Sequence, residues 1–222
     1  MSGPFRAAIV DLDGTLVDTL GDFEQALNAT LADLQLPPVS AAFIARTVGQ
    51  GSEHLIRNTL AEAGAAQDVF DAAWARYQHH YGRVNGQHAE VFPGVHVGLA
   101  AMRSAGWRLA CLTNKLTAFA QALLASKGLA ANFELVFGGD AFARKKPDPL
   151  PVTETCRALG LPPAEVLMVG DSRNDAAAAT AAGCAVVLLR HGYNHGEPID
   201  EVPALAHLDR LDQLFTTLSG PG

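Results

Sequence analysis

Two aspartates lie two residues apart where an apolar run near the N-terminus ends. Asp11 and Asp13 follow a run over 7–10 that has the composition of a buried strand, and Gly14 and Thr15 come next. Carboxylates this close repel strongly in a partly dry site, so such a pair usually needs a cation or a shared proton. A ligand site is therefore predicted here, with a metal ion as the first candidate. A solvated turn is the alternative, because Asp, Gly and Thr also favour turns.

Three later segments carry polar side chains where a predicted strand ends or a turn follows. Each has an ordinary alternative, since hydroxyls and acids also cap helix N-termini and a single lysine is usually solvated. The three segments are Thr113-Asn114-Lys115, Lys146 before Pro147-Asp148-Pro149, and Asp171 with Asp175.

One topology would bring all these groups to the carboxyl edge of a single sheet, which is where ligands bind in open α/β sheets. The cluster would hold four acids, a lysine, a hydroxyl and free backbone N–H groups. Carboxylate and hydroxyl oxygens favour a hard cation such as Mg²⁺ over zinc. A magnesium ion, a lysine and backbone donors around one point would suit a phosphate group.

The elements that position these groups alternate between strand and helix after residue 91. An α/β fold with a Rossmann-like parallel sheet is therefore predicted, and residues 18–87 are predicted to be an all-helical insert after the first strand. The expected domains are a core of residues 1–17 and 88–222 and a helical cap of 18–87. The predicted strands are 7–10, 108–113, 135–137, 166–170, 185–189 and one near 205; the predicted helices are 22–36, 40–47, 52–63, 69–81, 95–105, 117–127, 149–159, 174–183 and 208–218.

Composition narrows the class of protein. The net charge is −7, from 16 basic and 23 acidic residues, and no long Lys/Arg cluster indicates nucleic-acid binding. Three cysteines without metal spacing suit a reducing compartment, and Cys111 is expected in the core. The chain shows no signal sequence, and its apolar stretches are shorter than the ~18 residues of a membrane span. A cytoplasmic protein without membrane or nucleic-acid partners is expected from these features. Composition does not choose between a monomer and a homodimer.

Four motifs in a fixed order carry a resemblance to the haloacid-dehalogenase-like hydrolase superfamily: DLDGT at 11–15, LTN at 112–114, Lys146 in KKPDP, and GDSRND at 170–175. The chain is most similar to bacterial phosphoglycolate phosphatases within it. That narrower match includes VGQG at 48–51, GGD at 138–140, and Gly192-Tyr193-Asn194.

The resemblance implies a role for each matching residue. Asp11 would be the nucleophile, and Asp13 would protonate the leaving group and then activate water. Thr113, the Asn114 amide and Lys146 would bind and neutralise the phosphoryl group. The implied Mg²⁺ ligands are Asp11, the backbone carbonyl of Asp13, and Asp171, with Asp175 as a ligand or as the group that orients its waters.

Several further residues are weaker candidates. Lys115 would pair with a substrate carboxylate, although a solvent-facing helix start is equally compatible. Gly49 and Gln50 would form a cap loop over the leaving group, or a simple helix-helix turn. Arg57 is expected at the surface. His191, His195 and Glu197 are a weak metal candidate in a Gly-rich loop. Trp74 and Tyr77 have the spacing of core residues of the insert. His79 and His80 are expected on its solvated surface.

The expected reaction is Mg²⁺-dependent hydrolysis of a small phosphate monoester, with 2-phosphoglycolate as the best candidate. A sugar-phosphate or other metabolite phosphatase is the nearest alternative. A phosphosugar mutase is less favoured, because the loop 49–53 offers no cation for a second phosphate. A phospho-accepting receiver domain and an inactive binding protein stay open. Receivers, however, lack an insert of this size and are phosphorylated on a middle strand.

Overall fold

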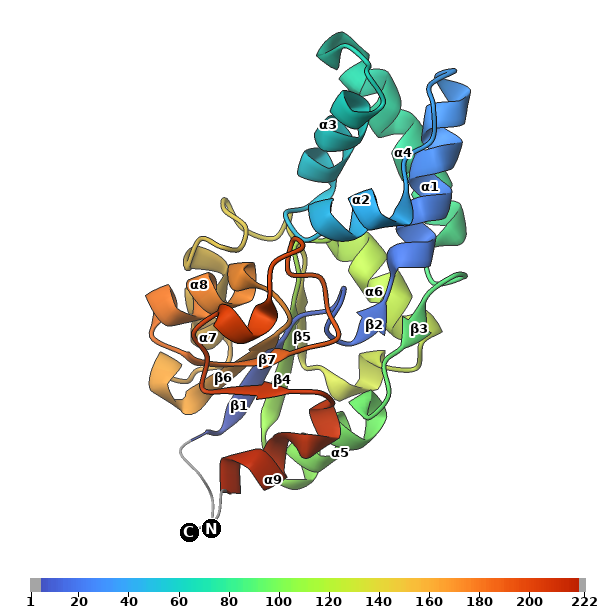
Figure 1. The fold of residues 1–222 in the computed structure, drawn as a ribbon. Coiled ribbons are helices and arrows are strands. Elements are labelled where there is room, and N and C mark those ends of the chain that lie inside the picture. The colour runs from blue at the N-terminus through green and yellow to red at the C-terminus, as the bar shows by residue number, and fades with distance from the viewer. Residues whose placement is uncertain (1–4, 220–222) are drawn as a thin grey trace.

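A six-stranded parallel sheet forms the centre of the computed structural model, which describes residues 5–219 (Figure 1). The strand order is β5-β4-β1-β6-β7-β8. Strand β1 (Ala7–Val10) is fully buried, with Ala8 and Val10 in one apolar cluster and Ala7 and Ile9 in the other. Both faces of the sheet are therefore covered by helices, as a continuous apolar strand indicates.

The strands and helices of this core alternate along the chain, as predicted. The other strands of the sheet are β4 (Arg108–Leu112), β5 (Leu135–Phe137), β6 (Val166–Gly170), β7 (Ala185–Leu189) and β8 (Ala206–Leu208). One face packs against α7 (Leu150–Ala158) and α8 (Arg173–Ala182). The other face packs against α5 (Val95–Ser104), α6 (Thr117–Ser126) and α9 (Leu214–Ser219).

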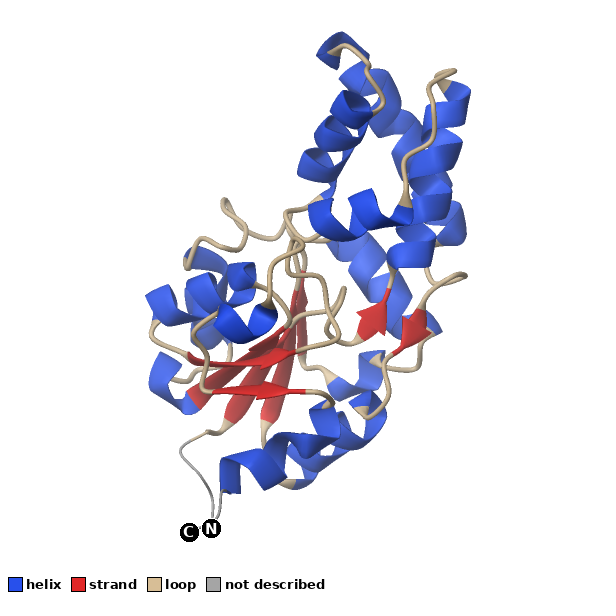
Figure 2. Ribbon diagram, in the orientation of Figure 1, coloured by secondary structure: helices blue, strands red, loops and turns tan. Residues whose placement is uncertain are grey.

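Four α-helices over residues 20–84 form a separate group, called here the helical insert. They are α1 (Leu20–Asp33), α2 (Ala41–Thr47), α3 (Ser52–Glu62) and α4 (Phe70–Val84). Their apolar faces share a core of their own, which includes Phe23, Leu55 and Tyr81. Figure 2 shows this helical group beyond one end of the sheet. The insert therefore lies over the edge at which the sheet's carboxyl ends meet.

A two-stranded ribbon connects the insert to the core. Strand β2 (Val17–Asp18) pairs antiparallel with β3 (Glu90–Val91). The sequence predicted only helix over 18–87, and this prediction was wrong at Asp18. A two-residue strand is too short to show alternation, so no periodic pattern marks it.

The first insert helix begins two residues before the predicted start at Asp22. The Asp22 carboxylate does not cap this helix but accepts hydrogen bonds from the backbone N–H groups of Gly86 (2.6 Å) and His88 (2.8 Å). It thus joins the two connections of the insert. None of the helices described over residues 5–219 combines the length and apolar character needed to span a bilayer.

Candidate active site

The candidate site lies at β1, the strand on either side of which the chain adds its later strands. The chain adds β4 and β5 on one side of β1 and then β6, β7 and β8 on the other. Loops after β1, β4 and β6 therefore diverge and leave a crevice at the carboxyl ends of these strands. Asp11, Thr113 and Asp171 each follow one of these strands directly. The topology brings together the residues that the strand-end pattern singled out.

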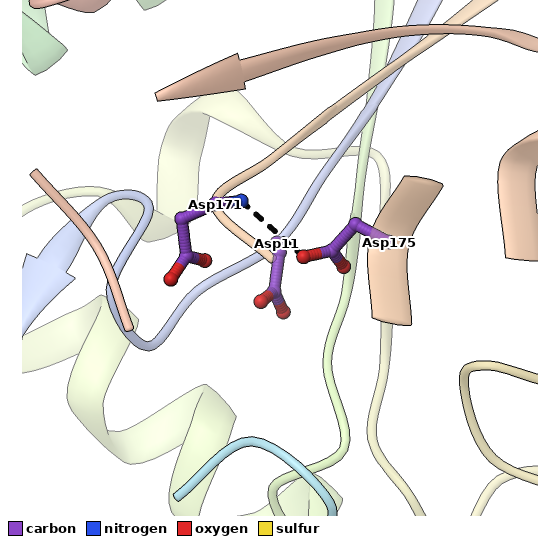
Figure 3. A group of neighbouring side chains, drawn as sticks. All are labelled: Asp11, Asp171 and Asp175. Atoms are coloured by element: carbon purple, nitrogen blue, oxygen red, sulfur yellow. Dashed lines mark hydrogen bonds between the residues drawn. The ribbon is translucent and has the colours of Figure 1, made fainter. Parts of the chain in front are cut away.

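Three carboxylates form the centre of the site. One oxygen each from Asp11, Asp171 and Asp175 lie within 4.8 Å of one another. Figure 3 shows the carboxylates of Asp171 and Asp175 on either side of Asp11. Burial raises the pKa of Asp11 to about 7, against the opposing effect of Lys146, and the charge of Asp175 adds to the rise. Burial, then the charges of Asp175 and Asp11, also raise the pKa of Asp171.

This cluster fits a hard divalent cation. The Asp11 Oδ1 atom lies 2.9 Å from the Lys146 ammonium, but one ammonium does not balance three carboxylates with oxygens within 4.8 Å of one another. Like charges this close are costly in a buried site, and a divalent cation would offset them. The atoms of this cluster that could ligate a metal are carboxylate oxygens, the ligands that Mg²⁺ prefers.

Lys146 is buried and contacts two of the three carboxylates. Its Nζ atom lies 2.9 Å from Asp11 Oδ1 and 2.7 Å from Asp175 Oδ1, and it donates to the Leu112 carbonyl at 2.8 Å. Burial alone would lower the pKa of Lys146, but the two carboxylates outweigh it and raise that pKa. The solvated alternative for this lysine was therefore wrong, and its charge stays within the site.

Asp171 is held by donors on both oxygens. Thr15 Oγ1 donates to Oδ1 at 2.6 Å, and the Tyr193 backbone N–H donates to Oδ2 at 2.6 Å. Gly14 has φ +84°, and a Cβ built on it would lie 2.3 Å from Asp171 Oδ2. Only glycine combines that backbone conformation with such a close approach. The carboxylate is consequently fixed before any ligand binds.

Asp175 serves the helix as well as the site. Its Oδ2 atom accepts hydrogen bonds from the Ser172 hydroxyl at 2.8 Å and from the Ser172 and Asp171 backbone N–H groups. These contacts form a capping box at the start of α8. The other oxygen faces Lys146.

Asp13 and Lys115 form a second charged pair beside the first. Lys115 Nζ lies 2.6 Å from Asp13 Oδ1, which also accepts a hydrogen bond from Thr19 Oγ1 at 2.8 Å. The Lys115 side chain is only 3% exposed, and its ammonium lies 4.5 Å from the Phe23 ring centroid. The solvent-facing alternative for Lys115 was therefore wrong.

Asn114 connects the core to the helical insert. Its side-chain amide donates to the carbonyls of Gly49 (2.9 Å) and Lys146 (2.8 Å) and accepts from the Lys146 backbone N–H at 3.0 Å. Gly49 has φ +114°, a conformation that favours glycine. The neighbouring Thr113 is buried and accepts from the Lys115 backbone N–H.

A small cavity of about 30 Å³ lies between the helical insert and Asp11. The structure places Gln50 on the exposed side of its loop, outside the lining of this cavity, whereas Gly49 and Gly51 line it. Pockets for drug-sized ligands are typically about 300–1,000 Å³, so this cavity suits a small group. Its lining consists of Asp11, Asp13, Phe23, Val48, Gly49, Gly51, Ser52, Leu55, Tyr77, Tyr81, Thr113, Asn114, Lys115 and Phe119.

Tyr193 is a site residue to which the sequence assigned no role. Its backbone N–H binds Asp171, its hydroxyl donates to Asp18 Oδ1, and that hydroxyl accepts from the Thr19 backbone N–H at 3.0 Å. It thus joins the acidic cluster to the ribbon. The Gly192-Tyr193-Asn194 motif was the only signal, and it gives no contact partners.

The other candidate residues lie outside the cluster of three carboxylates. Arg57 is exposed and pairs with Glu53, and Cys111 is buried. Tyr77 is buried in the insert core, although it also lines the cavity. Among the described residues, only the three aspartates form a metal-capable cluster, so His191 and His195 do not belong to one.

Known proteins resemble the chain over most of its length. The profile of the family described as haloacid dehalogenase-like hydrolase matches residues 8–189. A phosphoglycolate phosphatase of Thiobacillus denitrificans is 42% identical over 212 residues, 91% of this chain and 93% of that protein. The plasmid phosphoglycolate phosphatase of Cupriavidus necator is 45% identical over 221 residues, 99% and 95% of the two chains.

A solved structure from Haemophilus somnus 129pt, named as a predicted phosphoglycolate phosphatase, superposes with a TM-score of 0.93. It is 32% identical and covers 98% of this chain and 100% of its own. Because the family profile spans most of the chain and the curated relatives exceed 40% identity, the chain belongs to the haloacid dehalogenase-like hydrolase family.

Proposed function

We propose that this protein hydrolyses a small phosphate monoester, best 2-phosphoglycolate, through an aspartyl phosphate on Asp11. The single observation that carries the choice of substrate is the buried Lys115 ammonium, which lines the small cavity beside Asp11 and Asp13. A cation at that place would pair with a carboxylate on the leaving group. The relatives named phosphoglycolate phosphatases support the same substrate.

In the first half-reaction, an Asp11 carboxylate oxygen attacks phosphorus and the bond from phosphorus to the ester oxygen breaks. Asp13, in its protonated form, gives its proton to the departing alkoxide oxygen and becomes the carboxylate that pairs with Lys115. Lys146, 2.9 Å from Asp11, neutralises charge on the nucleophile and the transferring group. The Asn114 side chain is occupied by two carbonyls, so its backbone N–H and the Thr113 hydroxyl are the proposed phosphate donors.

In the second half-reaction, Asp13 takes a proton from water, whose oxygen attacks phosphorus. The bond between phosphorus and Asp11 breaks, and inorganic phosphate and the free carboxylate are released. Dividing hydrolysis into two transfers is the gain of covalent catalysis. Thr19, which donates to Asp13 at 2.8 Å, holds this carboxylate in place for both steps.

The carboxylates of Asp11 and Asp171 and the backbone carbonyl of Asp13 are the proposed Mg²⁺ ligands, with Asp175 orienting bound water. When bound, Mg²⁺ neutralises phosphoryl charge and aligns the ester with the nucleophile.

The helical insert is proposed to be the cap of the enzyme, residues 18–87, on a core of residues 1–17 and 88–222. The hydrogen bonds from Asn114 and Asn174 to the Gly49 carbonyl support this assignment, because they fix an insert loop over the site. The β2–β3 ribbon supplies two adjacent connections for opening and closure. The cytoplasmic location and the monomeric or homodimeric state stay predictions.

The rival functions differ in what the site must offer. A sugar-phosphate phosphatase needs hydrogen-bond partners for the sugar hydroxyls, whereas apolar side chains such as Phe23, Leu55 and Phe119 line much of this cavity. A mutase needs a cation for a second phosphate, and Arg57 near the insert loop pairs with Glu53 instead. A receiver or inactive protein would show no turnover.

A panel of two- to six-carbon phosphate esters, assayed with Mg²⁺, tests the proposed substrate. We expect kcat/KM to be highest for 2-phosphoglycolate. Lys115→Met should lower that kcat/KM by about 10- to 100-fold more than it lowers kcat/KM for ethyl phosphate, because a charge-assisted hydrogen bond contributes about 1.5–3 kcal/mol. Initial rates of phosphate release measure both values.

Arg144→Met is the control for charge, since it removes one positive charge from an exposed residue outside the cavity lining. It should leave the ratio between the two esters unchanged. A preference for sugar phosphates, or an equal loss on both esters in Lys115→Met, would contradict the assignment of 2-phosphoglycolate.

Metal binding predicts a stability effect that needs no substrate. At Mg²⁺ concentrations about a hundredfold above Kd, stability should rise by about 2.7 kcal/mol. The raised pKa of Asp11, about 7 against 3.8 in the unfolded chain, makes the metal-free protein lose stability as pH rises from about 4 to 7. The Mg²⁺-induced rise in Tm should therefore be larger at pH 8 than at pH 5.

Asp171→Asn should abolish most of this rise in Tm, whereas Asp71→Asn, at an exposed position on α4, should preserve it. Thermal melts with Mg²⁺ and with a chelator give the comparison. An equal rise in the wild type and in Asp171→Asn would exclude Asp171 as a ligand.

A further inference from the structure

Tyr81 carries a buried hydroxyl that neither the fold nor the mechanism above explains. The residue is 1% exposed, and its hydroxyl oxygen has no hydrogen-bond partner among the described residues. Buried tyrosine hydroxyls usually find a partner, and an unsatisfied one is a rare and destabilising feature in native proteins. A bound ligand could therefore provide the hydrogen-bond partner that the Tyr81 hydroxyl lacks among the described residues.

The Tyr81 ring is fixed on several sides. It stacks on Phe23 and on Tyr77, each with ring centroids 5.3 Å apart, and meets Phe119 edge-on at 5.1 Å. The Lys115 ammonium lies 4.9 Å from its centroid. Because these contacts come from both the insert and the core, the ring cannot turn its hydroxyl toward another group without repacking them.

The cavity that Tyr81 lines is the one shared by Asp13 and Lys115. Burial raises the pKa of the Tyr81 hydroxyl, and the negative charge of Asp13 raises it further. The hydroxyl thus keeps its proton and is a hydrogen-bond donor. Tyr77 lines the same cavity, but its hydroxyl has the Ser52 side chain beside it.

We propose that Tyr81 is a specificity-determining residue whose hydroxyl donates a hydrogen bond to the carboxylate of the leaving group. The proposal rests on the proposed function, because it takes the carboxylate partner of Lys115 as given. Lys115 would neutralise the charge of the substrate carboxylate, and the Tyr81 hydroxyl would orient that carboxylate through a hydrogen bond. Phe23 and Phe119 would exclude water from the contact. A site with a fixed, buried donor discriminates against an ester that lacks the acceptor, since the donor is then left unpaired.

Tyr81→Phe tests this donor by removing one oxygen atom. We expect the KM for 2-phosphoglycolate to rise about tenfold, with kcat within twofold of the wild type. The kcat/KM for ethyl phosphate, which has no carboxylate, should stay within twofold. Tyr77→Phe is the matched control, and it should change both esters by the same factor.

Thermal stability separates recognition from a structural role. The Tm of Tyr81→Phe should equal or exceed that of the wild type, because the substitution removes an unpaired polar atom and keeps the ring. A lower Tm, an equal effect on both esters, or an unchanged KM for 2-phosphoglycolate would overturn the proposal. If the wild type itself does not prefer 2-phosphoglycolate over ethyl phosphate, the proposed substrate fails first, and the role of Tyr81 fails with it.

Discussion

Asp11→Asn should reduce phosphate release by about 10⁴-fold or more, the scale seen when a covalent nucleophile is removed. The amide has the shape of the carboxylate but is a far poorer nucleophile. The fold should persist, because the substitution also removes one of three crowded carboxylates. We therefore expect the metal-free Tm of Asp11→Asn to be no lower than that of the wild type.

Steady-state rates with Mg²⁺ and thermal melts with a chelator measure the two effects of Asp11→Asn. Asp71→Asn, an exposed aspartate on α4, is the control for the change in net charge. Turnover within tenfold of the wild type would show that Asp11 is not the nucleophile. A large fall in Tm would instead indicate that Asp11 stabilises the fold.

Lys146→Met should abolish activity and also destabilise the protein by about 3–5 kcal/mol, because it leaves two buried carboxylates without their cation. Both Asp11 and Asp175 lie within 3 Å of the Lys146 ammonium, at 2.9 and 2.7 Å. Methionine keeps most of the length of the side chain, so the loss isolates the charge. Chemical denaturation gives the free energy of unfolding.

Two comparisons make the result for Lys146 specific. Arg144→Met removes one positive charge from an exposed position two residues away and should cost little stability. Combining Lys146→Met with Asp11→Asn should recover part of the lost stability, since one uncompensated charge is then gone. A Lys146→Met protein as stable as the wild type would show that the ammonium does not offset these carboxylates.

The core of the fold could be predicted from the sequence because its elements are local patterns. Strands such as 166–170 and 185–189 are short apolar runs, and the structure confirms both. The helical insert was also visible, as helices with one apolar face. The β2–β3 ribbon was not, because its two-residue strands pair across more than seventy intervening residues.

The acidic centre of the site could be found because topology converts strand ends into neighbours. Asp11 and Asp171 follow adjacent strands, so a parallel sheet alone brings them together. The environments of the lysines could not be found in this way. Lysine is usually a surface residue, so the sequence gives no sign that Lys115 and Lys146 are buried. Tertiary packing alone places them beside Asp13 and Asp11.

Contacts made by side chains on the insert were the hardest to predict. Tyr81 has the helical spacing of a core residue, and it does pack in the insert core. That it also faces the cavity beside Asp13 depends on how the insert sits on the sheet, which no local pattern encodes. Tyr193 likewise contacts Asp171 and the ribbon through a loop without periodicity.

The central claim is that a phosphoryl group passes through Asp11. Acid quenching during steady-state turnover of 2-phosphoglycolate with Mg²⁺, followed by peptide mass spectrometry, tests it most directly. We predict one phosphoryl group on the peptide that contains Asp11, and none when Mg²⁺ is withheld. A phosphorylated residue elsewhere, or no phosphorylated peptide in samples quenched while phosphate is being released, would contradict the account.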